Sequence, residues 1–84
     1  MSYLVYILHC ADNTYYTGIT TDLTRRLQEH NGPTLGARYT KTRQPVQLVY
    51  QEEKPDRSSA QKREAEIKRL SRTQKISLIQ QYRG

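Results

Sequence analysis

The sequence predicts an α+β fold, in which a small three-stranded antiparallel sheet is flanked by helices in the order ββαβαα. Three features predict it: two short aromatic and β-branched runs separated by turn residues, a later apolar run, and helical spacing of apolar residues in the segments between and after them. With 84 residues, the chain is long enough for one domain. We expect this domain to span residues 2–78, with residues 79–84 as the end of a C-terminal helix and a tail.

The first two strands are expected to form an antiparallel hairpin. Residues 3–8 (YLVYIL) and 14–19 (TYYTGI) have strand composition, and the Ala11-Asp12-Asn13 segment between them has turn chemistry. Gly18 ends the second run, and a glycine inside a strand often marks a close approach of other groups to the backbone. Residues 46–50 (VQLVY) predict the third strand.

A first helix is expected between the capping segment Thr20-Thr21-Asp22 and the stop signal Asn31-Gly32-Pro33, where Asn or Gly can adopt a left-handed cap. His30 shares the apolar face of this helix with two leucines, and Arg26 lies beside it. A histidine on such a face is more often a hydrogen-bonded core residue than a catalyst. Arg26 could equally be a solvated helix residue, so both alternatives stay open.

Two further helices are expected after the third strand. One covers residues 59–70, with a cap at Asp56 or Ser58, and the other covers residues 74–82. The short segment Arg72-Thr73 is predicted to be the joint between them.

Glu64 lies on the face of the helix over residues 59–70 that should contact the protein. At about 100° per residue, it falls in one narrow arc with Ala60 and Ile67. An unpaired buried carboxylate is costly, so Glu64 either pairs with a cation or holds a metal ion. Lys68, four residues further on, could supply that cation, and the residues alone leave both interpretations open.

The charge of the chain favours a polyanionic partner. Fourteen Lys and Arg residues stand against eight Asp and Glu residues, for a net charge of +6. Such an excess indicates nucleic acid first, although it could also merely keep the protein in solution. We expect the loop over residues 31–45 to act as a flexible clamp, since it is basic and has no acid. The candidate phosphate contacts are Gly18, Arg25, Arg38, Lys41, Arg43, Lys68 and Arg72.

Several other classes are excluded by what the sequence lacks. There is one cysteine, Cys10, which cannot form an internal disulfide, and no apolar run approaches the ~20 residues of a membrane span. There is no phosphate-binding glycine-rich loop, and His9, Cys10 and His30 are too scattered for a zinc site. The first residues do not look like a signal peptide, so we expect an intracellular, cytoplasmic protein.

Two triplets near the start of the chain resemble the motif of the GIY-YIG nucleases. Leu4-Val5-Tyr6 is followed, after nine residues, by Tyr16-Thr17-Gly18, although the first triplet lacks its glycine. The next helix also resembles that family, with Arg26 ten residues past Tyr16 and His30 four residues further on. Glu64, preceded by an arginine, resembles the metal-binding glutamate of the family.

The resemblance covers residues 2–78 and is strongest to the small stand-alone bacterial members, which are predicted endonucleases. It implies a GIY-YIG domain that holds a single Mg²⁺ or Mn²⁺ ion at Glu64, and an Arg26 that clamps the scissile phosphate. It implies that Tyr6 is the general base, supported by Tyr16, while His30 hydrogen-bonds one phenol or takes its proton. Which phenol loses a proton stays open. The expected products carry 5′-phosphate and 3′-hydroxyl ends.

These expectations combine into a metal-dependent endonuclease that hydrolyses phosphodiester bonds, with DNA preferred to RNA. No segment resembles a base-reading helix, so the substrate should be recognised by structure rather than by sequence. A protein partner could supply targeting, and no membrane association is expected. The alternative is a non-catalytic module on the same fold, which binds nucleic acid or docks on a partner without cutting.

Overall fold

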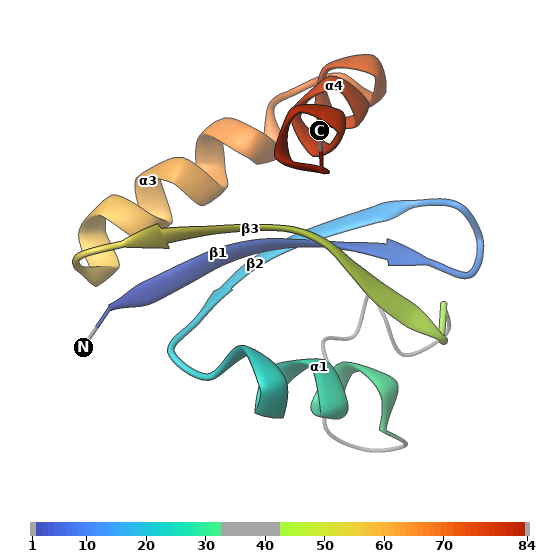
Figure 1. The fold of residues 1–84 in the computed structure, drawn as a ribbon, viewed down its shortest axis with the longest axis horizontal. Coiled ribbons are helices and arrows are strands. Elements are labelled where there is room, and N and C mark those ends of the chain that lie inside the picture. The colour runs from blue at the N-terminus through green and yellow to red at the C-terminus, as the bar shows by residue number, and fades with distance from the viewer. Residues whose placement is uncertain (1, 33–42, 84) are drawn as a thin grey trace.

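The computed structural model describes residues 2–32 and 43–83. In this part of the chain, a three-stranded antiparallel sheet carries helices on both faces (Figure 1). The elements are β1 (Tyr3–Cys10), β2 (Tyr15–Thr20), α1 (Leu23–Asn31), β3 (Val46–Lys54), α3 (Arg57–Lys68) and α4 (Arg72–Arg83). The predicted α+β class and the order ββαβαα are therefore confirmed.

The central strand β1 separates two hydrophobic clusters. The strand order is β2-β1-β3, and successive side chains of β1 point to opposite faces of the sheet. Val5 and Ile7 pack in one cluster with residues of α3 and α4, whereas Tyr6 and Leu8 pack in the other beside the leucines of α1. All four are at most 1% exposed, because both faces of β1 are covered. This arrangement puts Tyr6 on the α1 face of the sheet.

Strand β3 is longer than the sequence predicts. Its backbone pairs with β1 as far as Lys54, which lies opposite Tyr3, whereas the strand was predicted only over residues 46–50. The four added residues are polar and give no β-branched or aromatic signal. Their pairing is supported by Glu52, whose carboxylate accepts a 2.6 Å hydrogen bond from Tyr50 and lies 2.9 Å from Lys54 Nζ.

Both ends of α1 are fixed by side chains. Asp22 caps its start by accepting a 3.1 Å hydrogen bond from the backbone N–H of Arg25. The helix ends at Asn31, as predicted, but Gly32 has a φ of −82° and is not a left-handed cap. Instead, the Asn31 side-chain amide bonds both backbone groups of Val46, at 2.8 and 3.2 Å. This contact anchors the last turn of α1 to the start of β3.

The last two helices begin earlier than predicted. Asp56, rather than Ser58, caps α3 by accepting a 2.7 Å hydrogen bond from the backbone N–H of Ser59. Ahead of α4, the Ser71 hydroxyl accepts from the backbone N–H of Gln74 at 3.2 Å, while the Gln74 side chain accepts from Ser71 N at 2.9 Å. This reciprocal capping box starts the helix at Arg72, so the prediction of a joint at residues 72–73 was wrong.

Candidate active site

Tyr6 occupies a place that Gly18 keeps open. The two residues are register partners on β1 and β2. A Cβ atom added to Gly18 would lie 2.6 Å from the Tyr6 hydroxyl oxygen and 2.7 Å from its Cζ atom. The ring therefore lies across the backbone of Gly18, and only glycine leaves room for it. This is the close approach that the sequence predicts at Gly18, whose contact with nucleic acid stays a prediction.

His30 meets Tyr6 from the last turn of α1. Its Nε2 atom is 2.9 Å from the Tyr6 hydroxyl oxygen, and its side chain is fully buried. Burial, followed by the positive charge of Arg26, lowers the pKa of His30 to about 4. The imidazole is consequently neutral at physiological pH, with one ring nitrogen as donor and the other as acceptor.

Arg26 lies one turn before His30 on α1, and its positive charge acts on the same phenol. Burial raises the pKa of Tyr6 to about 12, and the neighbouring Arg26 only partly offsets this effect. The tautomer of the neutral His30 ring decides which group donates in the 2.9 Å bond between Tyr6 and His30. Tyr6, Arg26 and His30 thus form one polar cluster on the α1 face.

Tyr16 lies against the same pair of rings. Its ring centroid is 5.1 Å from that of His30 and 6.4 Å from that of Tyr6. Tyr16 and Gly18 are two residues apart on β2 and therefore share a face of the sheet. The structure thus brings four of the five predicted catalytic residues together on the α1 face.

Glu64 approaches this cluster from α3. It lies on the face of α3 that carries Ala60 and Ile67, both fully buried, as its spacing predicts. Its negative charge is near enough to Tyr6 to contribute to the raised pKa of the phenol. The Glu64 carboxylate, 22% exposed, also lies 3.4 Å from Lys68 Nζ, so the ion pair offered as the alternative to metal binding does form.

Glu64 by itself is compatible with a hard cation that keeps most of its water. Within residues 2–32 and 43–83, no group of three or more His, Cys, Asp or Glu side chains could hold a metal ion. Mg²⁺ commonly binds through one or two carboxylates, with waters and phosphate oxygens as its other ligands. A single partly exposed carboxylate such as Glu64 fits that coordination, whereas a site made only of protein ligands would not form here.

The residues predicted to contact phosphate have different neighbours in the structure. Arg25 is 75% exposed beside the cluster, and Lys68 is 54% exposed beside Glu64. Arg43 forms a 2.8 Å ion pair with Asp12 at the end of the β1–β2 hairpin. Arg72 donates a 2.7 Å hydrogen bond to the Asn13 carbonyl at the same hairpin end. Arg38 and Lys41 lie outside the described residues.

Sequence reasoning missed Glu29. Its carboxylate oxygens lie 3.1 Å from Arg25 Nε and 3.0 Å from Arg26 Nη1, so one acid binds both arginines of α1. The hydrogen bond from Arg26 is the main cause that lowers the pKa of Glu29. The signal was present, because acids three and four residues after a basic side chain lie next to it on a helix.

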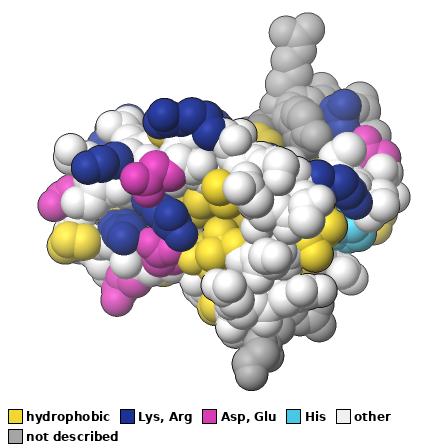
Figure 2. All heavy atoms as spheres, turned by 90° about the horizontal axis from the view of Figure 1, so that it is seen from above, with side chains coloured by type: hydrophobic (Ala, Val, Ile, Leu, Met, Phe, Trp, Pro, Cys, Tyr) yellow, Lys and Arg dark blue, Asp and Glu magenta, His cyan; other side chains and the backbone are white. Residues whose placement is uncertain are grey.

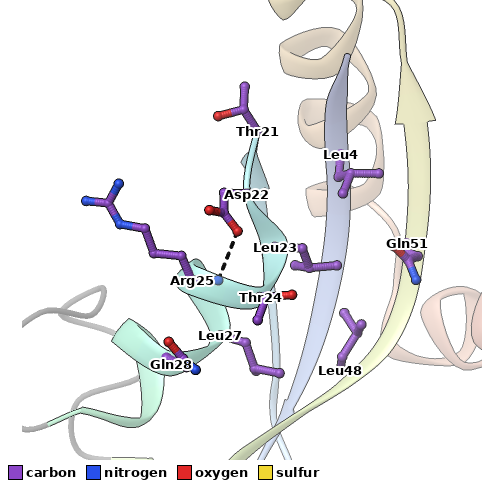
Figure 3. Close-up of a pocket in the computed structure, with 10 residues that line it drawn as sticks. All are labelled: Leu4, Thr21, Asp22, Leu23, Thr24, Arg25, Leu27, Gln28, Leu48 and Gln51. Atoms are coloured by element: carbon purple, nitrogen blue, oxygen red, sulfur yellow. Dashed lines mark hydrogen bonds between the residues drawn. The ribbon is translucent and has the colours of Figure 1, made fainter. Parts of the chain in front are cut away.

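A hollow with a volume of about 890 Å³ lies along α1, apart from the predicted catalytic residues. It is bordered by leucines of the sheet and of α1, among them Leu4, Leu23 and Leu48, together with polar side chains (Figure 3). It includes none of the five predicted catalytic side chains.

Charges of both signs alternate on the face that carries α3 and α4. Figure 2 shows Lys and Arg side chains interleaved with Asp and Glu over α3, next to an apolar area. Such a mixture forms no broad surface of a single sign on this face.

Among the described helices, none has the length and apolar character needed to cross a bilayer.

The sheet order and the cluster of phenols, imidazole, guanidinium and carboxylate define a nuclease-like domain. The family model described as the GIY-YIG catalytic domain matches residues 2–77. The chain therefore belongs to the GIY-YIG family, as its motifs predict, and this membership implies a nuclease-like function on nucleic acid.

Within this family, the chain is similar to proteins named UPF0213. It is 56% identical over 78 residues to one from Desulfotalea psychrophila (93% of this chain, 71% of the relative) and 53% identical over 77 residues to one from Syntrophus aciditrophicus (92% and 88%). Two NMR structures also match. A UPF0213 protein of Bacillus halodurans has a TM-score of 0.61 and 42% identity, covering 95% of this chain and 84% of its own. A protein from E. faecalis has a TM-score of 0.67 and 40% identity, covering 99% and 88%.

Proposed function

We propose that this protein is a metal-dependent endonuclease that hydrolyses phosphodiester bonds in DNA. The observation that carries the proposal is the 2.9 Å hydrogen bond between the Tyr6 hydroxyl and Nε2 of His30, with Arg26 and Glu64 near enough to shift the pKa of Tyr6. These groups come from β1, α1 and α3, which pack together. A merely structural buried tyrosine would need only one hydrogen-bond partner, with no guanidinium or carboxylate beside it.

In this proposal Tyr6 activates the attacking water, and His30 receives the phenolic proton. The 2.9 Å hydrogen bond already joins the two groups, and His30 can accept the proton in the tautomer whose Nε2 is unprotonated. At neutral pH the proton stays on Tyr6 before substrate binds, because the pKa of Tyr6 is about 12 and that of His30 is about 4. Proton transfer therefore belongs to the substrate complex, in which additional positive charge beside the phenol favours its ionised form.

The remaining groups bind the phosphate and stabilise its negative charge. Arg26 offers a planar fork of donors that matches two phosphate oxygens, a geometry that lysine cannot reproduce. Tyr16 supports the water or the phosphate by hydrogen bonding. Glu64 would hold Mg²⁺ or Mn²⁺, which supplies Lewis acidity and neutralises charge that develops on the phosphate oxygens.

Recognition is proposed to depend on the shape and backbone of DNA. Arg25 and Lys68 lie on two different helices and Arg43 lies at the end of the β1–β2 hairpin, each beside a carboxylate. Dispersed cations of this kind suit phosphates of the backbone rather than base edges. We also propose that the substrate is DNA rather than RNA, that the protein acts in the cytoplasm, and that a partner protein delivers it to its target.

The decisive experiment is a cleavage assay with charge-matched variants. Wild-type protein, Glu64→Gln and Glu66→Gln are incubated with labelled flapped, branched, single-stranded and duplex DNA, in Mg²⁺, in Mn²⁺ and in chelator. Glu66 is the control because it lies on the same helix, pairs with Arg63 at 3.4 Å and is 49% exposed. Both variants lose one negative charge from α3.

We expect cleavage in the metal-containing reactions, a loss of about 100-fold or more in Glu64→Gln, and near wild-type rates in Glu66→Gln. Arg26→Lys keeps the charge but loses the fork, and it should lower the rate by about 10²–10³-fold. Equal cleavage by all variants would identify a contaminating nuclease. Binding of DNA without cleavage in either metal would replace the proposal with the non-catalytic module.

A further inference from the structure

Glu29 occupies the donors of the arginine that the proposed function gives to the phosphate. Its two oxygens bind two different guanidiniums, Arg25 Nε at 3.1 Å and Arg26 Nη1 at 3.0 Å. The Glu29 side chain is 19% exposed, so most of its surface is covered within this arrangement. A carboxylate and a phosphate use the same donors of an arginine fork. Glu29 therefore stands where a phosphate oxygen would bind.

A polar hollow of about 110 Å³ lies next to these ion pairs. It is bordered by Thr20, Thr21, Asp22, Arg25, Arg26 and Glu29. The Asp22 carboxylate is committed to the cap of α1, where it accepts the hydrogen bond from Arg25 N. The Thr20 hydroxyl already donates to the backbone carbonyl of Asp22 at 3.3 Å. The Thr21 hydroxyl and the two guanidiniums are the bordering side-chain donors that suit an anion. Of the two acids that border the hollow, Asp22 and Glu29, it is Glu29 that forms ion pairs with the guanidiniums of Arg25 and Arg26.

We propose that Glu29 is an anion gate, which competes with phosphate for Arg25 and Arg26 and thereby selects polynucleotides over single phosphate anions. The inference rests on the proposed function, because it takes the phosphate of a nucleic acid as the ligand of Arg26. A single phosphate anion can gain only the contacts with Arg25 and Arg26 that Glu29 releases. A polynucleotide brings neighbouring phosphates to other cations at the same time, and these additional contacts displace the carboxylate.

The alternative is that Glu29 only holds Arg26 in position for Tyr6 and the phosphate. The two possibilities predict opposite signs for the same substitution. If Glu29 competes, its neutralisation tightens anion binding, because a like charge beside the ligand is removed. If Glu29 only positions Arg26, its neutralisation loosens the fork and weakens binding.

The test measures binding of inorganic phosphate, and of a short single-stranded oligonucleotide, in chelator and at low salt. The proteins are wild type, Glu29→Gln and the control Glu66→Gln, which also removes a carboxylate paired with an arginine three residues earlier. Phosphate is titrated by NMR, with the arginine Nε–H signals as the readout. Amide spectra establish that each variant is folded. Glu29→Asp is the second variant, since its shorter side chain keeps the charge but cannot bridge both arginines.

We expect Glu29→Gln to bind phosphate about three- to tenfold more tightly than wild type, and Glu66→Gln to stay within about twofold. The preference for oligonucleotide over phosphate should fall in Glu29→Gln, and Glu29→Asp should lie between it and wild type. Unchanged or weaker phosphate binding in Glu29→Gln, or an equal gain in both variants, overturns the gate. Because no cleavage is measured, failure of this inference is separate from failure of the endonuclease proposal.

Discussion

Tyr6 and His30, 24 positions apart in the sequence, are joined by a 2.9 Å hydrogen bond inside the protein. Tyr6 comes from the middle of the central strand and His30 from the last turn of α1, and each is at most 1% exposed. Both side chains are buried, and the bond satisfies one polar atom of each. The bond therefore links the packing of α1 on the sheet to the protonation state of the site.

Gly18→Ala is expected to destabilise the protein, because the added methyl group would lie 2.6 Å from the Tyr6 hydroxyl oxygen. The neighbouring strand backbone cannot move away without breaking its pairing, so we expect a loss of about 1–3 kcal/mol in the free energy of unfolding. Chemical denaturation measures this value. In the double variant with Tyr6→Leu, part of the loss should disappear, since the clashing ring is gone. Strict additivity of the two single effects would contradict the steric explanation.

His30 should make stability depend on pH between about 6.5 and 4. The pKa of His30 is lowered to about 4 in the fold, whereas the unfolded chain binds this proton near pH 6.5. The stabilisation is therefore complete above about pH 6.5 and is lost as pH falls through 4, by up to about 3 kcal/mol. Urea unfolding at a series of pH values measures it, and His30→Gln should flatten the curve in this window. An unchanged slope in His30→Gln would rule out His30 as its source.

Glu52 should make the free energy of unfolding depend on pH in a second range, below that of His30. Burial raises its pKa, but hydrogen bonds from Lys54, Tyr50 and Arg63 outweigh that effect and bring the pKa of Glu52 down to about 2. Its stabilisation is present above about pH 4.5 and is lost as pH falls toward 2. Water reaches part of this carboxylate, so we expect about 1–2 kcal/mol at neutral pH, less than the full shift would give.

Glu52→Gln measures this contribution, and Glu53→Gln is its matched control. Glu53 is the next residue of β3, is exposed, and accepts one hydrogen bond from Ser2. We expect Glu52→Gln to weaken the attachment of α3, because the 3.1 Å pair with Arg63 joins that helix to β3. Glu53→Gln should change the free energy of unfolding by less than about 0.5 kcal/mol. Similar losses in both variants would argue against a special role for Glu52.

The sequence predicted those parts of the fold that have a local signal. The two aromatic strands, the buried face of α1 and the inward position of Glu64 follow from periods of two and about 3.6 residues. The start of α4 was predicted too late, because the reciprocal bonds between Ser71 and Gln74 form a capping box that begins the helix at Arg72. The end of β3 was missed because residues 51–54 are polar and are held by pairing with β1.

The site was predictable as a set of residues but not as a geometry. Motif spacing identifies Tyr6 and Gly18 separately, yet only strand register shows that one lies across the other. Likewise, the hydrogen bond between Tyr6 and His30 joins two side chains that only tertiary packing brings together. The spacing of Glu29 from Arg25 and Arg26 is a local signal, but only the structure shows that one carboxylate binds both guanidiniums.

Arg72 gives a last test, because its contacts favour a structural role over the phosphate contact predicted from the sequence. Its Nη1 atom donates a 2.7 Å hydrogen bond to the Asn13 carbonyl, and its guanidinium lies 5.1 Å from the centroid of the Tyr15 ring. These contacts join the start of α4 to the end of the β1–β2 hairpin. We expect Arg72→Ala to lower the free energy of unfolding by about 1–2 kcal/mol.

The salt dependence of DNA binding separates the two roles of Arg72. Each lost phosphate contact should reduce the slope of log K against log salt by about 0.9 on duplex DNA. We expect Arg25→Ala, which removes a cation that is 75% exposed, to show this reduction. Arg72→Ala should leave the slope nearly unchanged at a temperature where the variant is folded. A reduction as large as that of Arg25→Ala, without loss of stability, would instead assign Arg72 to the nucleic-acid surface.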